Sequence, residues 1–140
     1  MPKPPLPDDV TTLLRRANPA VMATVRPDGA PVSVATWYLW DDEPGPDGQG
    51  RVLLNLDAGR ARLEHLRKDP RVSLTVLDGE QWYRHISLRG SVTLQDDPDL
   101  NDIDRLSVHY VGHAYSDRTR PRVTAWMRVE SYHAWPPGAW

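Results

Sequence analysis

The 140-residue sequence contains no cysteine. This absence excludes disulfide bonds, thiolate nucleophiles and cysteine-ligated zinc sites, and it is consistent with a reducing compartment. The N-terminal stretch MPKPPLPDDV lacks the apolar segment of a secretory signal peptide. No apolar run reaches the roughly 18 residues of a membrane-spanning helix. We therefore expect a cytoplasmic protein that makes no contact with a membrane.

An excess of positive charge is also missing. The chain has 17 lysine and arginine residues against 19 aspartate and glutamate residues, which gives a net charge of -2. Binding along a nucleic-acid backbone requires a surplus of cations that replaces the counterions of the phosphates. The composition therefore predicts no nucleic-acid partner.

Several catalytic signatures are absent as well. The sequence has no Gly-x-Ser-x-Gly motif, no glycine-rich phosphate loop of the P-loop or Rossmann type, and no convincing pair of carboxylates. His109 and His113 have a spacing that would place both on one face of a helix, but a metal site needs further ligands. We interpret them as part of a solvated helix end and predict no metal site.

The apolar pattern predicts a single, mainly β domain with short helices, preceded by a flexible leader at 1–7. Six segments have the pattern of strands: 20–26, 31–40, 52–54, 72–77, 82–95 and 122–133. Short helices are expected after Asp8 or Asp9, after Gly59, and from the Asp97-Pro98 pair. Because hairpin turns join most of the strands, we expect a six-stranded antiparallel split β-barrel.

Three glycines mark turns or bends in this pattern. Gly29 follows Pro27-Asp28 between two strands, where a hairpin turn needs a positive φ. Gly90 lies within the long segment 82–95 and is expected to bend it or to form a bulge. Gly112 is placed to end the third helix.

The most informative stretch is 51–76. An apolar strand stops near Asn55, and an arginine-rich segment that begins with Arg60 and Arg62 is interpreted as a short helix. The first turn of a helix has free N–H groups and a positive dipole end, so stability alone would favour acidic residues there. Arginines at this place indicate a phosphate-binding pocket. The alternative is a solvated helix face, which is common for basic residues on a short helix.

Four pieces of the sequence together resemble a known family. In chain order they are ATVRPDGAPVSVATWYLW, VLLNLDAGRARLEHLRKDPRVSLTV, YRHISLRGSV and VESYHAW. They resemble the split β-barrel flavin and deazaflavin oxidoreductases, the superfamily of pyridoxamine-phosphate oxidase. The resemblance spans residues 20–135. Within the superfamily, the sequence is most similar to the branch that uses coenzyme F-420, a hydroxy-deazaflavin with a phosphate and an oligoglutamate tail.

The resemblance implies a cofactor site in two parts. In relatives, one strand lies along the deazaflavin ring, and the matching residues here are Val34, Ala35, Thr36 and Trp37. The segment that binds the ribityl phosphate matches 55–62, which includes Asn55, Arg60 and Arg62. Many relatives have lysine where this chain has Arg62, a change that keeps the charge and adds a planar fork suited to two phosphate oxygens.

Aromatic residues complete the site that the resemblance implies. Trp82 matches a position near the cofactor, and Arg84 would point the same way, although Trp82 could also be a core aromatic. For Trp37 we favour a pocket wall over simple packing, since an aromatic wall suits a flat ring. Tyr115, together with Arg118 and Arg120 in a polar loop, is a further candidate for the border of a substrate opening.

The resemblance also implies the chemistry and the assembly. A reduced deazaflavin donates a hydride by its own structure, so the protein has to bind, orient and exclude water, which agrees with the lack of catalytic motifs. We predict a coenzyme F-420-dependent reductase that acts on a small unsaturated or quinone-like acceptor. The alternatives are an FMN-binding oxidase or reductase and a non-catalytic cofactor-binding protein. Relatives are homodimers with cofactor sites at the interface, and the same is expected here.

Overall fold

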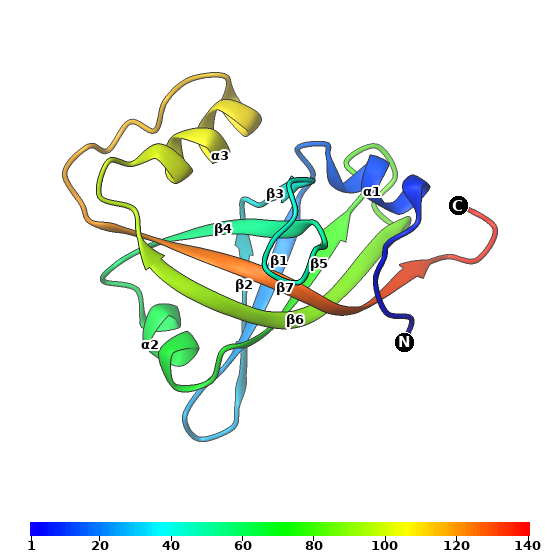
Figure 1. Cartoon of the computed structure of the whole chain (residues 1–140), viewed down its shortest axis with the longest axis horizontal. Helices are drawn as coiled ribbons and strands as arrows, with labels where there is room; N and C mark the ends of the chain where they lie inside the picture. Colours follow the sequence, from blue (N-terminus) through cyan, green and yellow to red (C-terminus); the bar gives the residue numbers. More distant parts are fainter.

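The computed structural model describes residues 1–140 as one antiparallel β-sheet that curls into a barrel, with three short helices around it (Figure 1). The sheet has seven strands in the order β2-β1-β5-β6-β7-β4-β3. In chain order they are β1 Ala20–Val25, β2 Pro31–Thr36, β3 Leu39–Asp41, β4 Arg51–Asp57, β5 Arg71–Leu77, β6 His85–Asp96 and β7 Arg122–Trp135. The prediction of a mainly β split barrel is confirmed.

The helices are α1 Asp8–Leu14, α2 Ala61–Lys68 and α3 Asn101–Val111. Helix α1 contributes Val10, Leu13 and Leu14 to the main core, together with the inward side chains of the strands. Helix α3 lies outside the barrel over a smaller core. None of the helices is both long and apolar enough to cross a membrane.

The predicted strand 31–40 is two strands, which is why the sheet has seven strands and not six. Thr36 at the end of β2 pairs with Ala20 of β1, at one edge of the sheet. Leu39 at the start of β3 pairs with Leu53 of β4, at the other edge. The chain therefore passes from one edge of the sheet to the other within two residues, and this step brings the two edges together.

Tyr38 explains the break between the two strands. Its side chain is fully buried, and its hydroxyl donates to the carbonyl of Leu14 at 2.9 Å and accepts from Nδ2 of Asn18 at 3.1 Å. These contacts tie the crossing point to the end of α1. Burial raises the pKa of the Tyr38 hydroxyl, so the group stays neutral and keeps its hydrogen bonds at physiological pH.

Helix α3 starts at Asn101, later than the predicted start at the Asp97-Pro98 pair. The carboxylate of Asp97 accepts from the backbone N–H groups of Asp102 at 3.1 Å and Ile103 at 3.0 Å. The prediction of a helix start at the Asp97-Pro98 pair was therefore wrong: Leu100, with a φ of 62°, is the N-cap residue, and Asp97 supports the first turn with its side chain from outside the helix. Gly112 ends the helix with a φ of 84°, as predicted.

Strand β6 is shorter at its start than the predicted segment 82–95. Trp82 and Tyr83 lie in an exposed turn, and the strand begins at His85. The register with β7 shifts between Arg89 and Gly90, so the predicted bulge at this glycine is confirmed. The bulge helps the long strand to curve around the barrel.

Candidate functional site

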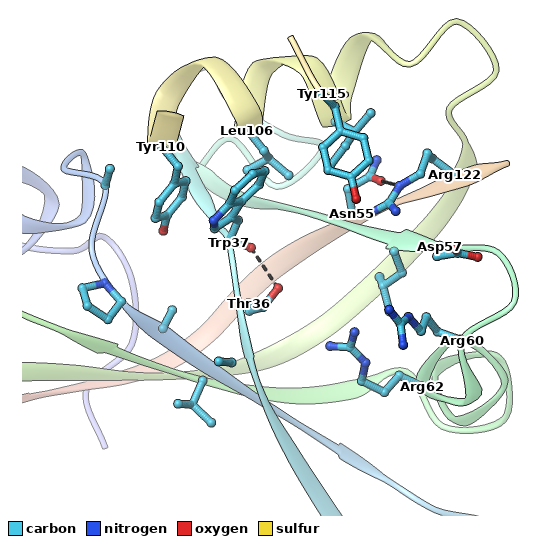
Figure 2. Close-up of a pocket in the computed structure, with 17 residues that line it drawn as sticks. Thr36, Trp37, Asn55, Asp57, Arg60, Arg62, Leu106, Tyr110, Tyr115 and Arg122 are labelled. Carbon is cyan, nitrogen blue, oxygen red and sulfur yellow. Dashed lines mark hydrogen bonds between the residues drawn. The ribbon is translucent and has the colours of Figure 1, made fainter. Parts of the chain in front are cut away.

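A cavity of about 650 Å³ opens between the edge of the barrel and helices α2 and α3. Its walls come from β1, β2, the end of β4, the start of α2, α3 and the start of β7 (Figure 2). Its size lies within the range of about 300–1,000 Å³ that is usual for small-molecule and cofactor sites. One part of its wall is apolar and aromatic, and the other is cationic.

The aromatic part of the wall is built around Trp37. Its ring stacks on that of Tyr110 from α3, with centroids 5.4 Å apart and planes 9° apart. Tyr115 meets Trp37 edge-on, at 6.2 Å and 86°. Figure 2 shows these rings on the α3 side of the cavity. Trp37 is therefore both a packed residue and a wall of the pocket, which agrees with the interpretation that we favoured.

The cationic part contains three arginines, Arg60, Arg62 and Arg122. No carboxylate forms an ion pair with any of them, although the protein has ion pairs elsewhere. Asp57 is the one acidic residue in the lining, and its carboxylate accepts from the backbone N–H of Gly59 at 2.8 Å and from Arg120 at 3.2 Å. The lining thus carries three positive charges and one negative charge that is already engaged.

Among the three arginines, Arg62 is the one with a buried donor atom that lacks a hydrogen-bond partner. Its Nη1 atom is buried and has no hydrogen-bond partner in the chain. Desolvation lowers the pKa of Arg62 first, and the neighbouring charges of Arg60 and Arg122 lower it further. A partly buried guanidinium with an unpaired Nη1 atom and two like charges nearby is costly, and an anion bound in the cavity would relieve that cost.

The turn between β4 and α2 positions Arg60 and Arg62 at the cavity. Strand β4 ends at Asp57, whose carboxylate and carbonyl accept from the N–H groups of Gly59 and Arg60 in a tight turn. Arg60 then occupies the N-cap position of α2, and no side chain caps that helix start. The helix therefore presents its first turn to the cavity together with Arg60 and Arg62 (Figure 2). The predicted strand, turn and basic helix are confirmed.

The structure brings together six of the nine residues predicted for the cofactor site. They are Ala35, Thr36, Trp37, Asn55, Arg60 and Arg62. Val34 lies on β2 opposite Met22 and does not line the cavity. Strand β4 extends beyond the predicted 52–54 to Asp57, so Asn55 is a strand residue with a buried side chain.

Trp82 and Arg84 lie outside the cavity of their own chain. Trp82 is 69% exposed, so the interpretation as a core aromatic was wrong. Arg84 instead forms an ion pair with Asp78 at 3.3 Å and lies over the ring of Trp140 at 3.9 Å. Within one chain, then, Arg84 is engaged by partners outside the cavity lining.

Several pocket residues were not singled out from the sequence, and three of them are polar or aromatic. Tyr110 and Arg122 were not expected to line a site, and Asp57 was included only as part of the predicted phosphate-binding segment 55–62. Asp57 and Arg122 are partners in the β4–β7 pairing, a proximity that becomes visible only when the strand register is known. Tyr115 lines the cavity, as its predicted place at an opening suggests.

The other candidate side chains have partners elsewhere. Arg118 forms an ion pair with Asp104 at 2.6 Å. His109 packs edge-on against Tyr110, and the Nδ1 atom of His113 lies 3.0 Å from the carbonyl oxygen of Ala114. No cluster of three potential metal ligands is present.

The split antiparallel barrel, with a basic pocket at the start of a short helix, places the chain in the class of split-barrel proteins. The family model described as pyridoxamine 5'-phosphate oxidase matches residues 6–136. The chain therefore belongs to this family, which has the flavin-binding split β-barrel fold of an oxidoreductase superfamily.

Solved structures agree with this assignment. A protein described as an F420 reductase superposes with a TM-score of 0.78 at 27% identity, over 91% of this chain and 98% of that chain. A conserved hypothetical protein of Mycobacterium tuberculosis gives 0.70 at 22% identity, over 95% and 86%. A pyridoxamine 5'-phosphate oxidase-related, FMN-binding protein of Nostoc punctiforme gives 0.62 at 13% identity, over 96% and 98%, and so shows the shared fold. A comparison with curated proteins gives no match.

Proposed function

We propose that the protein is a coenzyme F-420-dependent reductase that transfers a hydride from the reduced deazaflavin to a small unsaturated or quinone-like acceptor. The observation that carries this proposal is the group of three arginines without carboxylate partners beside an aromatic wall. Such a pocket suits a cofactor with a flat ring and a phosphate. The similarity to an F420 reductase over nearly the whole of both chains supports the deazaflavin branch.

The residues of the pocket fit this cofactor class. Arg60 and Arg62 would hold the phosphate, because the buried Nη1 of Arg62 lacks a partner that a phosphate oxygen would provide. Ala35, Thr36 and Trp37 would lie along the ring. The bound cofactor supplies the hydride chemistry when reduced, and the protein contributes orientation and exclusion of water.

The two tyrosines of the pocket have different parts in this proposal. The hydroxyl of Tyr110 donates to the carbonyl of Asn18 at 2.6 Å, and burial raises its pKa to about 12. Tyr110 therefore remains neutral and fixes the wall. The hydroxyl of Tyr115 makes no hydrogen bond within the chain, while its backbone N–H donates to Asp104. Tyr115 is thus the better placed of the two to give a proton to the acceptor after hydride transfer.

An FMN-dependent enzyme is the second candidate. The same arginines would bind the phosphate of FMN, and the FMN-binding protein of Nostoc punctiforme has the same fold. The two candidates differ in the ring that the pocket accepts, so the choice of cofactor separates them.

Turnover tests the enzymatic part of the proposal. Reduced coenzyme F-420 is mixed with the protein and with a panel of small quinones and α,β-unsaturated carbonyl compounds, and cofactor oxidation is followed by absorbance. We expect turnover with at least one acceptor, and we expect Tyr115→Phe to lower kcat by about tenfold or more while the cofactor Kd stays the same. Tight cofactor binding without turnover of any acceptor would favour a non-catalytic binding protein. An unchanged kcat in the variant would remove Tyr115 from the mechanism.

We further propose that the protein is a homodimer whose cofactor sites lie at the interface. Four neighbouring strands, β2, β1, β5 and β6, align small uncharged side chains on their outer face. Across the sheet this row contains Ala35, Val21, Thr75 and Ser87. Ala35 and Val21 also line the cavity, so the row leads directly into the site. A second copy packed on this flat face would close the open side of the pocket.

The substitution Val21→Glu tests the dimer. Val21 is 36% exposed, so the monomer should tolerate glutamate, but a closely packed interface would bury its charge. We expect the variant to sediment as a monomer; sedimentation is the readout, because Val21 also lines the cavity and a glutamate there would affect cofactor affinity directly. Val108→Glu on α3 is the matched control, because Val108 is also exposed and does not line the cavity. A wild-type protein that sediments as a monomer at micromolar concentration would contradict the proposal.

A further inference from the structure

Asn55 is a buried polar residue whose side chain is engaged at both ends. It is 9% exposed, and its Oδ1 atom accepts from Nε of Arg122 at 2.9 Å. Its Nδ2 group donates to Oδ2 of Asp97 at 3.1 Å and to the hydroxyl of Thr124 at 3.2 Å. The amide therefore has no group left for a ligand, although sequence resemblance assigned it to phosphate binding. Its direct partner at the cavity is Arg122.

The other end of this network is fixed to α3. Asp97 is 4% exposed, and its carboxylate also accepts from the first backbone N–H groups of the helix, at Asp102 and Ile103. Thr124 in turn donates to Oδ2 of Asp102 at 2.6 Å. Asp97 and Asn55 thus form a rigid support, because every polar side-chain atom of these two residues has a partner. Arg122 is the end of this support that reaches the cavity (Figure 2).

The guanidinium of Arg122 is held in place but not neutralised. Only its Nε donates to a protein group, and that group is the neutral amide of Asn55. Asp57 lies opposite Arg122 in the strand pairing, but its carboxylate is bound by Gly59 and Arg120. The ring of Tyr115 packs 5.0 Å from the Arg122 guanidinium carbon. The two Nη groups therefore remain available as donors, and the charge of Arg122 contributes to the repulsion at Arg62.

We propose that Arg122 is a third anion-binding residue of the site, which contacts the phosphate group of the bound ligand, and that Asn55 and Asp97 are its positioning residues. This inference deepens the proposed cofactor-binding function and shares its site. Phosphate has several oxygens that can accept from more than one guanidinium. Arg122 on β7 would therefore add a third guanidinium to those of Arg60 and Arg62 at the start of α2. Asn55 would then act through Arg122 and not through a contact of its own.

Titration with inorganic phosphate and with coenzyme F-420 tests this proposal. Phosphate alone probes the anion site whichever cofactor is native, and riboflavin, which has no phosphate, reports on the ring site. The variants are Arg122→Lys, Arg122→Gln, Asn55→Ala and the combination of Asn55→Ala with Arg122→Lys. Arg118→Lys is the matched control, since Arg118 is close in sequence, paired with Asp104 and absent from the cavity lining. Thermal unfolding of each variant reports on its fold.

Arg122→Lys is expected to weaken phosphate and coenzyme F-420 binding about tenfold, because lysine keeps the charge but lacks the Nε–H that Asn55 holds. Asn55→Ala should weaken both by a similar factor, and adding it to Arg122→Lys should change affinity less than about twofold. The affinity of these variants for riboflavin should stay within about twofold of wild type, and so should the affinity of the Arg118→Lys control for phosphate and coenzyme F-420. If Asn55→Ala does not fold, Arg122→Lys and Arg122→Gln are compared, and we expect both to lose the same affinity for phosphate and coenzyme F-420. If only the charge of Arg122 mattered, Arg122→Lys would keep wild-type affinity.

Several results would overturn the inference. An Arg122→Lys protein with wild-type phosphate affinity would show that the guanidinium held by Asn55 is not needed for binding. If the losses of affinity caused by Asn55→Ala and Arg122→Lys multiply in the combined variant, Asn55 does not act through Arg122. A wild-type protein that binds neither phosphate nor cofactor would refute the anion site itself. If the protein binds phosphate through Arg122 but binds neither F-420 nor FMN, the inference is upheld and the proposed function is rejected.

Discussion

Replacing Arg60 and Arg62 together by alanine is expected to weaken cofactor binding about 30- to 150-fold, which corresponds to about 2–3 kcal/mol. Both side chains enter the cavity from the start of α2, and neither has a carboxylate partner in the chain. Each charge-assisted hydrogen bond to a phosphate contributes about 1.5–3 kcal/mol. The loss is expected to be smaller than the sum of two such bonds, because removing one arginine also removes its repulsion of the other.

A substitution of Arg62 alone should weaken binding but increase stability. Arg62 carries a buried Nη1 atom without a partner, and its pKa is lowered by desolvation and by two neighbouring arginines. This charge destabilises the cofactor-free protein, so Arg62→Met should raise the midpoint of thermal unfolding while it weakens cofactor binding. The two effects are measured by isothermal titration with the cofactor and by thermal denaturation without it.

Arg67→Ala is the matched control for this pair of measurements. Arg67 lies on the same helix but is exposed and pairs with Glu64 at 2.7 Å, so its removal should leave cofactor affinity unchanged. Equal loss of affinity in Arg67→Ala would mean that the helix acts through its overall charge. An affinity of wild-type strength in the double variant would show that the arginines do not bind the cofactor.

Gly90→Ala is expected to lower the free energy of unfolding by about 3 kcal/mol or more. Gly90 forms the bulge where β6 shifts its register against β7. A Cβ at this position would overlap the carbonyl oxygen of Arg128 and would approach Val129 closely. These are backbone atoms of the neighbouring strand, so no side chain can move aside to make room.

Urea denaturation of Gly90→Ala and of the control Ser91→Ala measures this effect. Ser91 is the next residue on β6, and its side chain only donates to the exposed carboxylate of Glu130 at 3.2 Å. We expect the control to change stability by less than about 0.5 kcal/mol. A Gly90→Ala protein that unfolds at the wild-type urea concentration would show that β6 and β7 can separate at the bulge without cost.

Most of the barrel could be predicted from local pattern, but its closure could not. Segments such as 72–77 alternate clearly, and turn glycines such as Gly29, with a φ of 87°, have a local signature. The break at Trp37 and Tyr38 has no such signature, because the alternation continues through both residues. The break depends on hydrogen bonds that Tyr38 makes with α1, far away in the sequence.

The candidate site was predictable to a similar extent. Arg60 and Arg62 were recognised because cations at a helix start oppose the helix dipole, which is a local argument. Arg122 was missed because its importance comes from β4–β7 pairing and from a contact with Asn55 across the sheet. Asn55 was recognised through family resemblance, but its contacts give it the part of a support and not of a ligand-binding residue.

The most direct test of the central claim is a pair of binding titrations on the wild-type protein, one with coenzyme F-420 and one with FMN, both followed by fluorescence. We predict that F-420 binds with a Kd of about 1 μM or less, equivalent to about 8 kcal/mol, and that FMN binds at least about tenfold more weakly. Tight FMN binding without F-420 binding would contradict the deazaflavin assignment, and binding of neither would contradict the cofactor site.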